Sequence, residues 1–265
     1  MRSQDSLSSD LRAKADAGDV DAIEEAAQHY FDRIKDHELD VEPFKKYTAL
    51  GLDQKSYQCA RLLWRYHDLA LTEDSDASLA PKYCYMSYIY CSDKDPNKSY
   101  LLHECGNLLN EGALPKEAAE NTLDKLKVSA QSGDPDSAYL LYCILQKRED
   151  DKSSDSHLYL LQFASAKEVT EAMVDLGHYY EQHAKYKEAF DLYTKVEKLN
   201  DPSRFIGVYN LARCYAFGIG TEKNNELANR LFDESKELAE YMYENNQSKA
   251  AKRILELLID DTGKA

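Results

Sequence analysis

Residues 207–239, GVYNLARCYAFGIGTEKNNELANRLFDESKELA, contain two apolar-periodic segments separated by a turn with two glycines. In the first segment, Leu211, Ala212 and Tyr215 follow Gly207 by four, five and eight residues. This spacing places small and apolar side chains along one helical face, where small residues allow a second helix to approach closely. The stretch therefore predicts a pair of packed α-helices.

The same pattern recurs along the chain. The positions equivalent to Leu211 are, in reverse order, Leu176, Tyr142, Cys105, Ala60 and Ala26, with spacings of 35, 34, 37, 45 and 34 residues. A period of this length is typical of solenoids, in which each helical hairpin buries its apolar face against its neighbours. The sequence predicts six such repeats. The pattern is most degenerate in the second repeat, which carries an acidic insertion at 72–78, and in the fourth.

Capping signals place several helix boundaries in the same register. Aspartates mark three starts, at Asp21, Asp134 and Asp201. Glycines mark three ends, at Gly18, Gly51 and Gly133. We expect residues 1–10 to be a polar, disordered tail and 11–239 to be the solenoid. Residues 240–265 are expected to hold a capping helix, roughly Ser248 to Ile259, and a short tail.

At residues 207–239 the chain resembles the Sel1-like repeat family, within the tetratricopeptide-like superfamily of helical repeats. The resemblance rests on Leu211, Ala212 and Tyr215, the Gly-rich turn and the second helix, and it extends to 172–199 and 101–133. It implies an all-α fold, a right-handed superhelix of about six αα-hairpin repeats. It also implies an adaptor or scaffold that holds a partner protein or peptide in the concave groove.

Composition narrows the kinds of partner. The net charge of −15 repels the phosphates of nucleic acids and anionic membrane surfaces, whereas it attracts a protein with a basic patch. The sequence shows neither a run of apolar residues long enough to span a bilayer nor a secretory signal, so we expect a cytoplasmic protein. Six scattered cysteines fit reduced, packed thiols. We expect a monomer, although self-association through the second and fourth repeats is an alternative.

Sequence motifs for catalysis are absent. There is no P-loop, dinucleotide fingerprint, nucleophile elbow or zinc-protease motif, so we predict no catalytic residue, no cofactor and no metal. His178 and His183 are five residues apart, which points them away from each other on a continuous helix. A hydrolase that uses Asp175 with His178 is the alternative from the enzyme class.

One polar pattern predicts a binding site. Four repeats carry two polar residues that are three apart and share a helix face: Glu25 with Gln28, Glu104 with Asn107, Asp175 with His178, and Asn210 with Arg213. Three tyrosines lie close to these pairs, Tyr139, Tyr179 and Tyr209. Because first helices line the concave wall of a solenoid, we predict a ladder of partner-binding residues along it. The simpler interpretation is the solvated face of each first helix.

Two functions are compatible with such a ladder. One is the adaptor or scaffold implied by the resemblance. The other is a bacterial immunity protein that sequesters a toxic effector enzyme, since some immunity proteins resemble acidic members of this family. The high negative charge fits both functions, so the residues alone leave the choice open.

Overall fold

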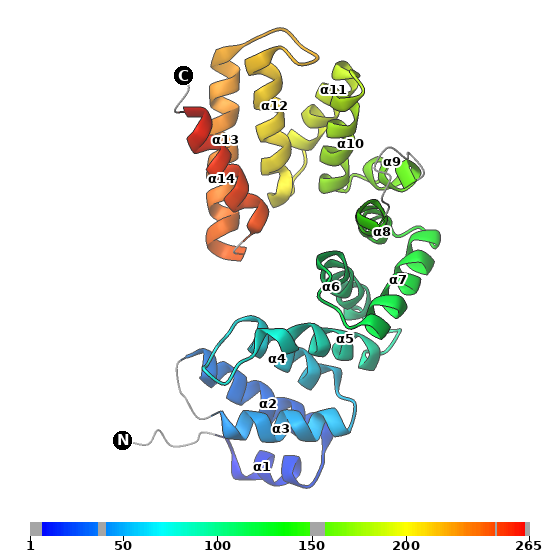
Figure 1. Cartoon of the computed structure of the whole chain (residues 1–265). Helices are drawn as coiled ribbons and strands as arrows, with labels where there is room; N and C mark the ends of the chain where they lie inside the picture. The colour runs from blue at the N-terminus through cyan, green and yellow to red at the C-terminus, as the bar shows by residue number, and fades with distance from the viewer. Residues whose placement is uncertain (1–6, 37–40, 149–156, 247, 263–265) are drawn as a thin grey trace. The chain divides into compact units, whose positions relative to one another are not determined.

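A computed structural model describes residues 7–36, 41–148, 157–246 and 248–262 (Figure 1). Over these residues the chain forms α-helices and short 3-10 turns, with no strand, which confirms the predicted all-α class. The chain divides into two compact units, an N-terminal unit of residues 1–129 and a C-terminal unit of residues 130–265. No helix in the described ranges is both long and apolar enough to cross a membrane.

Six first helices alternate with six second helices, as the period predicts. The first helices are α2 (Val20–Lys35), α4 (Tyr57–Asp68), α6 (Asn97–Glu111), α8 (Pro135–Arg148), α10 (Thr170–Gln182) and α12 (Phe205–Phe217). The second helices are α3 (Glu42–Asp53), α5 (Ala80–Tyr90), α7 (Lys116–Gln131), α9 (Leu158–Ala166), α11 (Tyr186–Glu197) and α13 (Asn225–Asn246). Each of the six aligned positions, from Ala26 to Leu211, lies in a first helix, and the chain is therefore an all-α array of helical repeats.

A helix that the sequence does not predict precedes the first repeat. Helix α1 spans Ser9–Asp16, and the Ser8 hydroxyl caps it by accepting a hydrogen bond from the Leu11 amide at 3.2 Å. At its other end, the Asp16 carboxylate accepts from Lys46 Nζ at 2.6 Å and from the Tyr47 hydroxyl at 3.0 Å, both on α3. The predicted tail over residues 1–10 is therefore wrong for 7–10, and residues 1–6 lie outside the described residues.

Side-chain caps mark the start of several first helices. The Asp19 carboxylate, rather than the predicted Asp21, caps α2 by accepting from the Ala22 amide at 2.9 Å. Asp134 caps α8 as predicted, with the Ser137 amide 3.0 Å from its carboxylate. Asp201 caps the short turn η3 (Pro202–Arg204) that leads into α12. Gly18 and Gly133 end their helices at φ of 92° and 96°, values that glycine adopts without strain.

The glycine at position 51 has a different role from the predicted one. Gly51 lies inside α3 and is buried, so it does not end a helix. A Cβ atom there would lie 2.2 Å from Cys59 Sγ on α4. Gly177 and Gly207 are also in such close contacts, with Tyr193 and Val196 of α11. These glycines allow consecutive helices to approach closely, as the repeat pattern requires.

Each unit has its own apolar core. In the N-terminal unit, Phe44 lies between Phe31 and Tyr66, with ring centroids 5.9 and 5.2 Å apart. These three side chains join α2, α3 and α4, which lie side by side (Figure 1). In the C-terminal unit, Tyr193 and Val196 of α11 are fully buried between α10 and α12. Five of the six cysteines are buried, as expected for packed thiols, and Cys143 is half-buried.

The last helix packs as a cap. Helix α14 (Lys249–Thr262) begins at Ser248, whose hydroxyl accepts from the Ala251 amide at 3.2 Å. It lies against α12 and α13 through Ala251, Ile254 and Leu258 (Figure 1). Helix α13 continues to residue 246, past the predicted end of the solenoid at 239, because Ala239 belongs to the core beneath α14.

Candidate functional site

The predicted ladder is open to solvent in the N-terminal unit. Glu25 and Gln28 are exposed on α2, where Gln28 Nε2 donates to both carboxylate oxygens of Asp32 at 3.0 Å. On α6, Asn107 is exposed and Glu104 is half-buried. Both helices therefore present polar groups on the predicted face, and Glu104 is the one that lies in a concave environment.

The second repeat, which has no rung in the predicted ladder, needs a corrected register. Alignment on Ala60 assigns the two polar positions to Cys59 and Leu62, but these are 0% and 6% exposed. Four positions are buried in each of α2, α6, α10 and α12, and in α10 they are Ala172, Met173, Leu176 and Gly177. The same spacing of buried residues in α4 is Cys59, Ala60, Leu63 and Trp64, so Leu63 is the equivalent of Leu176, three residues beyond Ala60. The longer spacing to the third repeat and the apolar run at 62–64 obscure this shift in the sequence.

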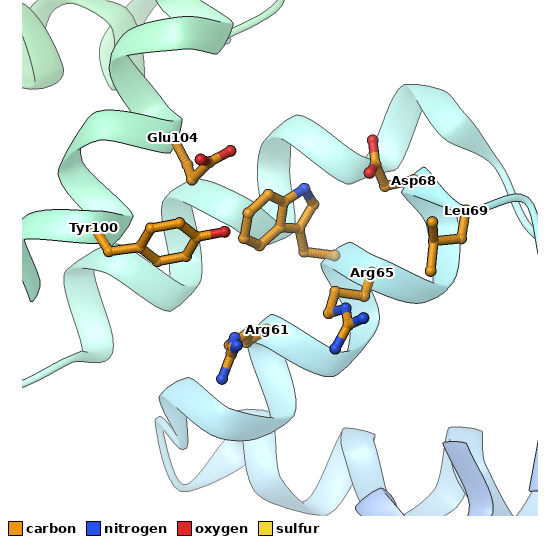
Figure 2. A pocket seen from close by; sticks show the side chains of 7 residues that line it. Arg61, Arg65, Asp68, Leu69, Tyr100 and Glu104 are labelled. Atoms are coloured by element: carbon orange, nitrogen blue, oxygen red, sulfur yellow. The ribbon is translucent and has the colours of Figure 1, made fainter. Parts of the chain in front are cut away.

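A pocket lies between α4 and α6. Its volume is about 380 Å³, and it is lined by Arg61, Trp64, Arg65 and Asp68 of α4, by Leu69 just after it, and by Tyr100 and Glu104 of α6 (Figure 2). The residues of α4 follow one helical face, and Tyr100 and Glu104 are one turn apart on α6. Trp64 is 8% exposed whereas Tyr100 is 47% exposed, so the pocket has a packed indole and a solvent-accessible phenol.

Four charged side chains meet at this pocket without pairing. Among the described residues, no ion pair within 4.0 Å involves Arg61, Arg65, Asp68 or Glu104. Burial raises the pKa of the Glu104 carboxyl, and the negative charge of Asp68 raises it further. The charge of His103 lowers the pKa of Glu104, but this only partly offsets the rise, and the carboxylate forms no ion pair within 4.0 Å among the described residues.

In the C-terminal unit, several of the predicted ladder residues form hydrogen bonds with one another. Arg213 Nη1 donates to Asn210 Oδ1 at 2.8 Å, and His178 Nε2 lies 3.2 Å from the same oxygen. Arg213 also pairs with Glu181 at 3.4 Å, and the Tyr193 hydroxyl donates to Glu181 Oε1 at 2.8 Å. These bonds join α10, α11 and α12 into one polar network. Asn210 is only 3% exposed, so it positions its neighbours rather than offering a contact surface.

A second pair links α8 with α10. The Tyr139 hydroxyl donates to Asp175 Oδ2 at 2.8 Å. Burial raises the pKa of the Asp175 carboxyl, and the hydrogen bond from Tyr139 opposes this rise. Burial also raises the pKa of the nearby Cys143 thiol to about 11. Two of the predicted ladder residues, Tyr139 and Asp175, are therefore held in one contact between successive first helices.

The remaining predicted residues of this unit, Tyr179 and Tyr209, contact other aromatic rings. Tyr179 stacks on His183 with centroids 4.1 Å apart, and His183 Nδ1 lies 2.8 Å from the Tyr179 carbonyl oxygen. Tyr209 is buried against Phe232 at 5.7 Å. His178 and His183 thus interact with different residues, and Asp175 and His178 form hydrogen bonds with different residues. In the C-terminal unit the predicted ladder residues therefore form contacts between repeats, and Tyr209 and Asn210 are buried.

Comparisons with known proteins identify the fold. The chain is similar to a Sel1 repeat protein from Oxalobacter formigenes, with a TM-score of 0.57 and 15% identity over 87% of this chain and 66% of the other. It is also similar to a protective antigen of uropathogenic Escherichia coli strains that displays an SLR, or Sel1-like repeat, fold. There the TM-score is 0.56 and the identity 18%, over 94% of this chain and 54% of the other.

These likenesses show the Sel1-like repeat fold and nothing more specific. The chain spans about two thirds of the length of the first structure and about half of the second. No family model matches the sequence. No curated protein matches it either.

Proposed function

We propose that this chain is a non-enzymatic interaction module that binds a partner protein or peptide on the polar face of its first helices. The observation that carries the proposal is the pocket between α4 and α6, where four charged side chains have no ion-pair partner among the described residues. A binding surface differs from an ordinary solvated helix face in that it gathers polar and aromatic groups in a concave place. This pocket has both kinds of group.

The contrast between the two units supports the proposal. In the C-terminal unit the ladder residues satisfy one another, so they hold the repeats together. In the N-terminal unit the charged side chains of α4 and α6 that line the pocket form no ion pair among the described residues, and Arg65 lies over the Phe31 ring. A half-buried charge without a partner loses hydration without compensation, and a bound protein supplies that compensation.

The fold also favours binding. Helices α2, α4, α10 and α12 each contact the helix before and the helix after them, so their surface side chains are presented by a packed backbone. A preformed surface loses little conformational entropy when it binds, which leaves more of the contact energy for affinity. A repeat scaffold of this kind suits the adaptor or scaffold role, and the identity of the partner decides between that role and sequestration of a toxic enzyme.

An affinity pull-down from the lysate of the source organism tests the proposal. The bait variant combines Arg61→Glu with Glu104→Lys, which reverses two pocket charges and keeps the net charge. The matched control combines Lys125→Glu with Glu120→Lys, both on exposed positions of α7. Circular dichroism first establishes that the three proteins are equally helical.

We expect wild type and control to retain one discrete protein that the pocket variant loses. Equal retention by all three proteins would show that the partner binds elsewhere. Retention of no protein by any of them would remove the main support for an interaction module.

A further inference from the structure

The charges of the pocket between α4 and α6 are sorted by sign. Figure 2 shows the carboxylates of Asp68 and Glu104 along one edge of the pocket and the guanidinium groups of Arg61 and Arg65 along the other. On α4, Arg61 and Arg65 are one turn apart, and Asp68 follows almost one turn later. The pocket therefore has an acidic edge and a basic edge rather than one uniform charge.

Aromatic side chains complete the lining. Trp64 lies on the same face of α4 as the two arginines, and Tyr100 lies one turn before Glu104 on α6. Figure 2 shows the Tyr100 hydroxyl directed into the space between Glu104 and Arg61. The face of an indole or phenol ring attracts cations, so an aromatic lining beside two carboxylates favours a guanidinium or ammonium group.

We propose that this pocket binds a dipolar segment of the partner protein, in which one Arg or Lys lies next to one Asp or Glu. The basic side chain lies against Glu104, Asp68 and the indole of Trp64. The acidic side chain pairs with Arg61 and Arg65. This inference rests on the proposed function and specifies the chemistry of the partner segment.

Neither charge alone satisfies the pocket. A purely acidic segment pairs with the arginines but faces the carboxylates of Asp68 and Glu104, and like charges at such distances repel. A purely basic segment has the opposite conflict with Arg61 and Arg65. Burial and the charge of Asp68 already raise the pKa of Glu104, so a cation on this edge has more effect than one in open solvent.

The chain contains a single tryptophan, Trp64, so its fluorescence reports on this pocket alone. The test titrates the full chain with four synthetic tetrapeptides that lack aromatic residues. They are acetyl-Ala-Arg-Glu-Ala-amide and its counterparts with Arg and Ala, with Ala and Glu, or with Ala and Ala at the central positions. Each is added at millimolar concentrations at low ionic strength, where screening is weak.

We expect the dipolar peptide to shift the Trp64 emission at lower concentrations than the other three. Glu104→Gln and Arg61→Gln should each weaken its binding by about fivefold, the upper range for a partly exposed ion pair. The matched changes Glu120→Gln and Lys125→Gln, on α7, should leave it within error. An equal response to the dipolar peptide and to any one of the other three peptides would overturn the inference.

The pull-down and the titration can fail separately. If the pocket variant loses a protein partner but the peptides do not discriminate, the interaction module stands and the dipolar chemistry is wrong. If the dipolar peptide binds as expected but no protein is retained from the lysate, the pocket chemistry stands and the proposed function is wrong.

Discussion

Replacing Gly177 by alanine tests the close approach of α10 and α11. A Cβ atom at this position would lie 2.5 Å from Cε1 and 2.7 Å from Cζ of Tyr193. Ordinary van der Waals contact begins near 3.4 Å, so the ring must move by about 0.9 Å. Tyr193 is fully buried and its hydroxyl donates to Glu181 at 2.8 Å, so this movement disturbs both the core and the polar network.

The expected cost follows from three effects. Overpacking a core typically costs about 1–3 kcal/mol. Loss of the hydrogen bond from Tyr193 to Glu181 costs about 1 kcal/mol, and the higher helix propensity of alanine returns about the same amount. We therefore expect Gly177→Ala to lower the free energy of unfolding by about 1–3 kcal/mol. The assay is thermal and urea unfolding followed by far-UV circular dichroism, with about 2–4 °C in Tm for each kcal/mol.

The same substitution in a Tyr193→Leu protein serves as the control. In a Tyr193→Leu protein the phenol ring is absent, so the alanine methyl has room and only its helix propensity remains. There Gly177→Ala should raise the free energy of unfolding, by up to about 1 kcal/mol. The double-mutant cycle isolates the contact between the two residues. The same effect in both backgrounds, or a stabilised single variant, would refute the packing argument.

Two further predictions concern the polar contacts of the C-terminal unit. Burial raises the pKa of the Asp175 carboxyl, so the folded state holds this proton to higher pH than the unfolded chain does, and stability falls as the pH rises from the ordinary value through the folded one. Asp175→Asn removes that ionisation but can keep the bond from Tyr139. It should therefore raise Tm near pH 7 by an amount that shrinks as the pH is lowered toward about 4, the ordinary carboxyl pKa, and a pH-independent difference would contradict this cause. Arg213→Ala removes the donor to buried Asn210 and the pair with Glu181, and it should cost about 1–3 kcal/mol in urea unfolding. The comparison is Lys187→Ala, which breaks an exposed pair with Asp191 and should cost less than about 0.5 kcal/mol. Similar losses of unfolding free energy in the Arg213→Ala and Lys187→Ala proteins would mean that the hydrogen bonds of Asn210 add little to stability.

The period of the repeats can be predicted from sequence because it depends on local patterns. The spacing from Ala26 to Leu211 places every first helix correctly, since small and apolar residues at helical intervals must lie on a buried face. Aspartate caps and positive-φ glycines add boundaries that are local as well. The role of Gly51 differs from the predicted one because a helix end and a close helix contact both favour glycine.

The candidate site was harder to predict because it depends on contacts between repeats. In α4 the insertion after the helix lengthens the spacing to the third repeat, and several consecutive residues are apolar. The burial of Cys59, Ala60, Leu63 and Trp64 fixes the register and places Arg65 at a polar position. Asn210 is buried because it contacts Arg213 on its own helix and His178 on α10.

Helix α1 was missed for a similar reason. Its sequence, SDLRAKAD, is short and polar, so composition favours a tail. Its contacts with α3, through Asp16 to Lys46 and Tyr47, are 30 and 31 residues away in the sequence. Short helices of this kind draw their stability from tertiary contacts rather than from propensity.

The hydrogen bonds that join successive first helices connect residues about one repeat apart: Tyr139 and Asp175 are separated by 36 residues, and His178 and Asn210 by 32. A duplication or deletion of one complete repeat would preserve such a pairing, because each new helix meets a neighbour with the same arrangement of faces. An insertion of one residue in α10 ahead of Asp175 would instead rotate the rest of that helix by about 100° relative to α8 and separate Asp175 from Tyr139. Changes of length in this lineage should therefore occur in whole repeats or in the connections between helices, as the acidic insertion after α4 already does.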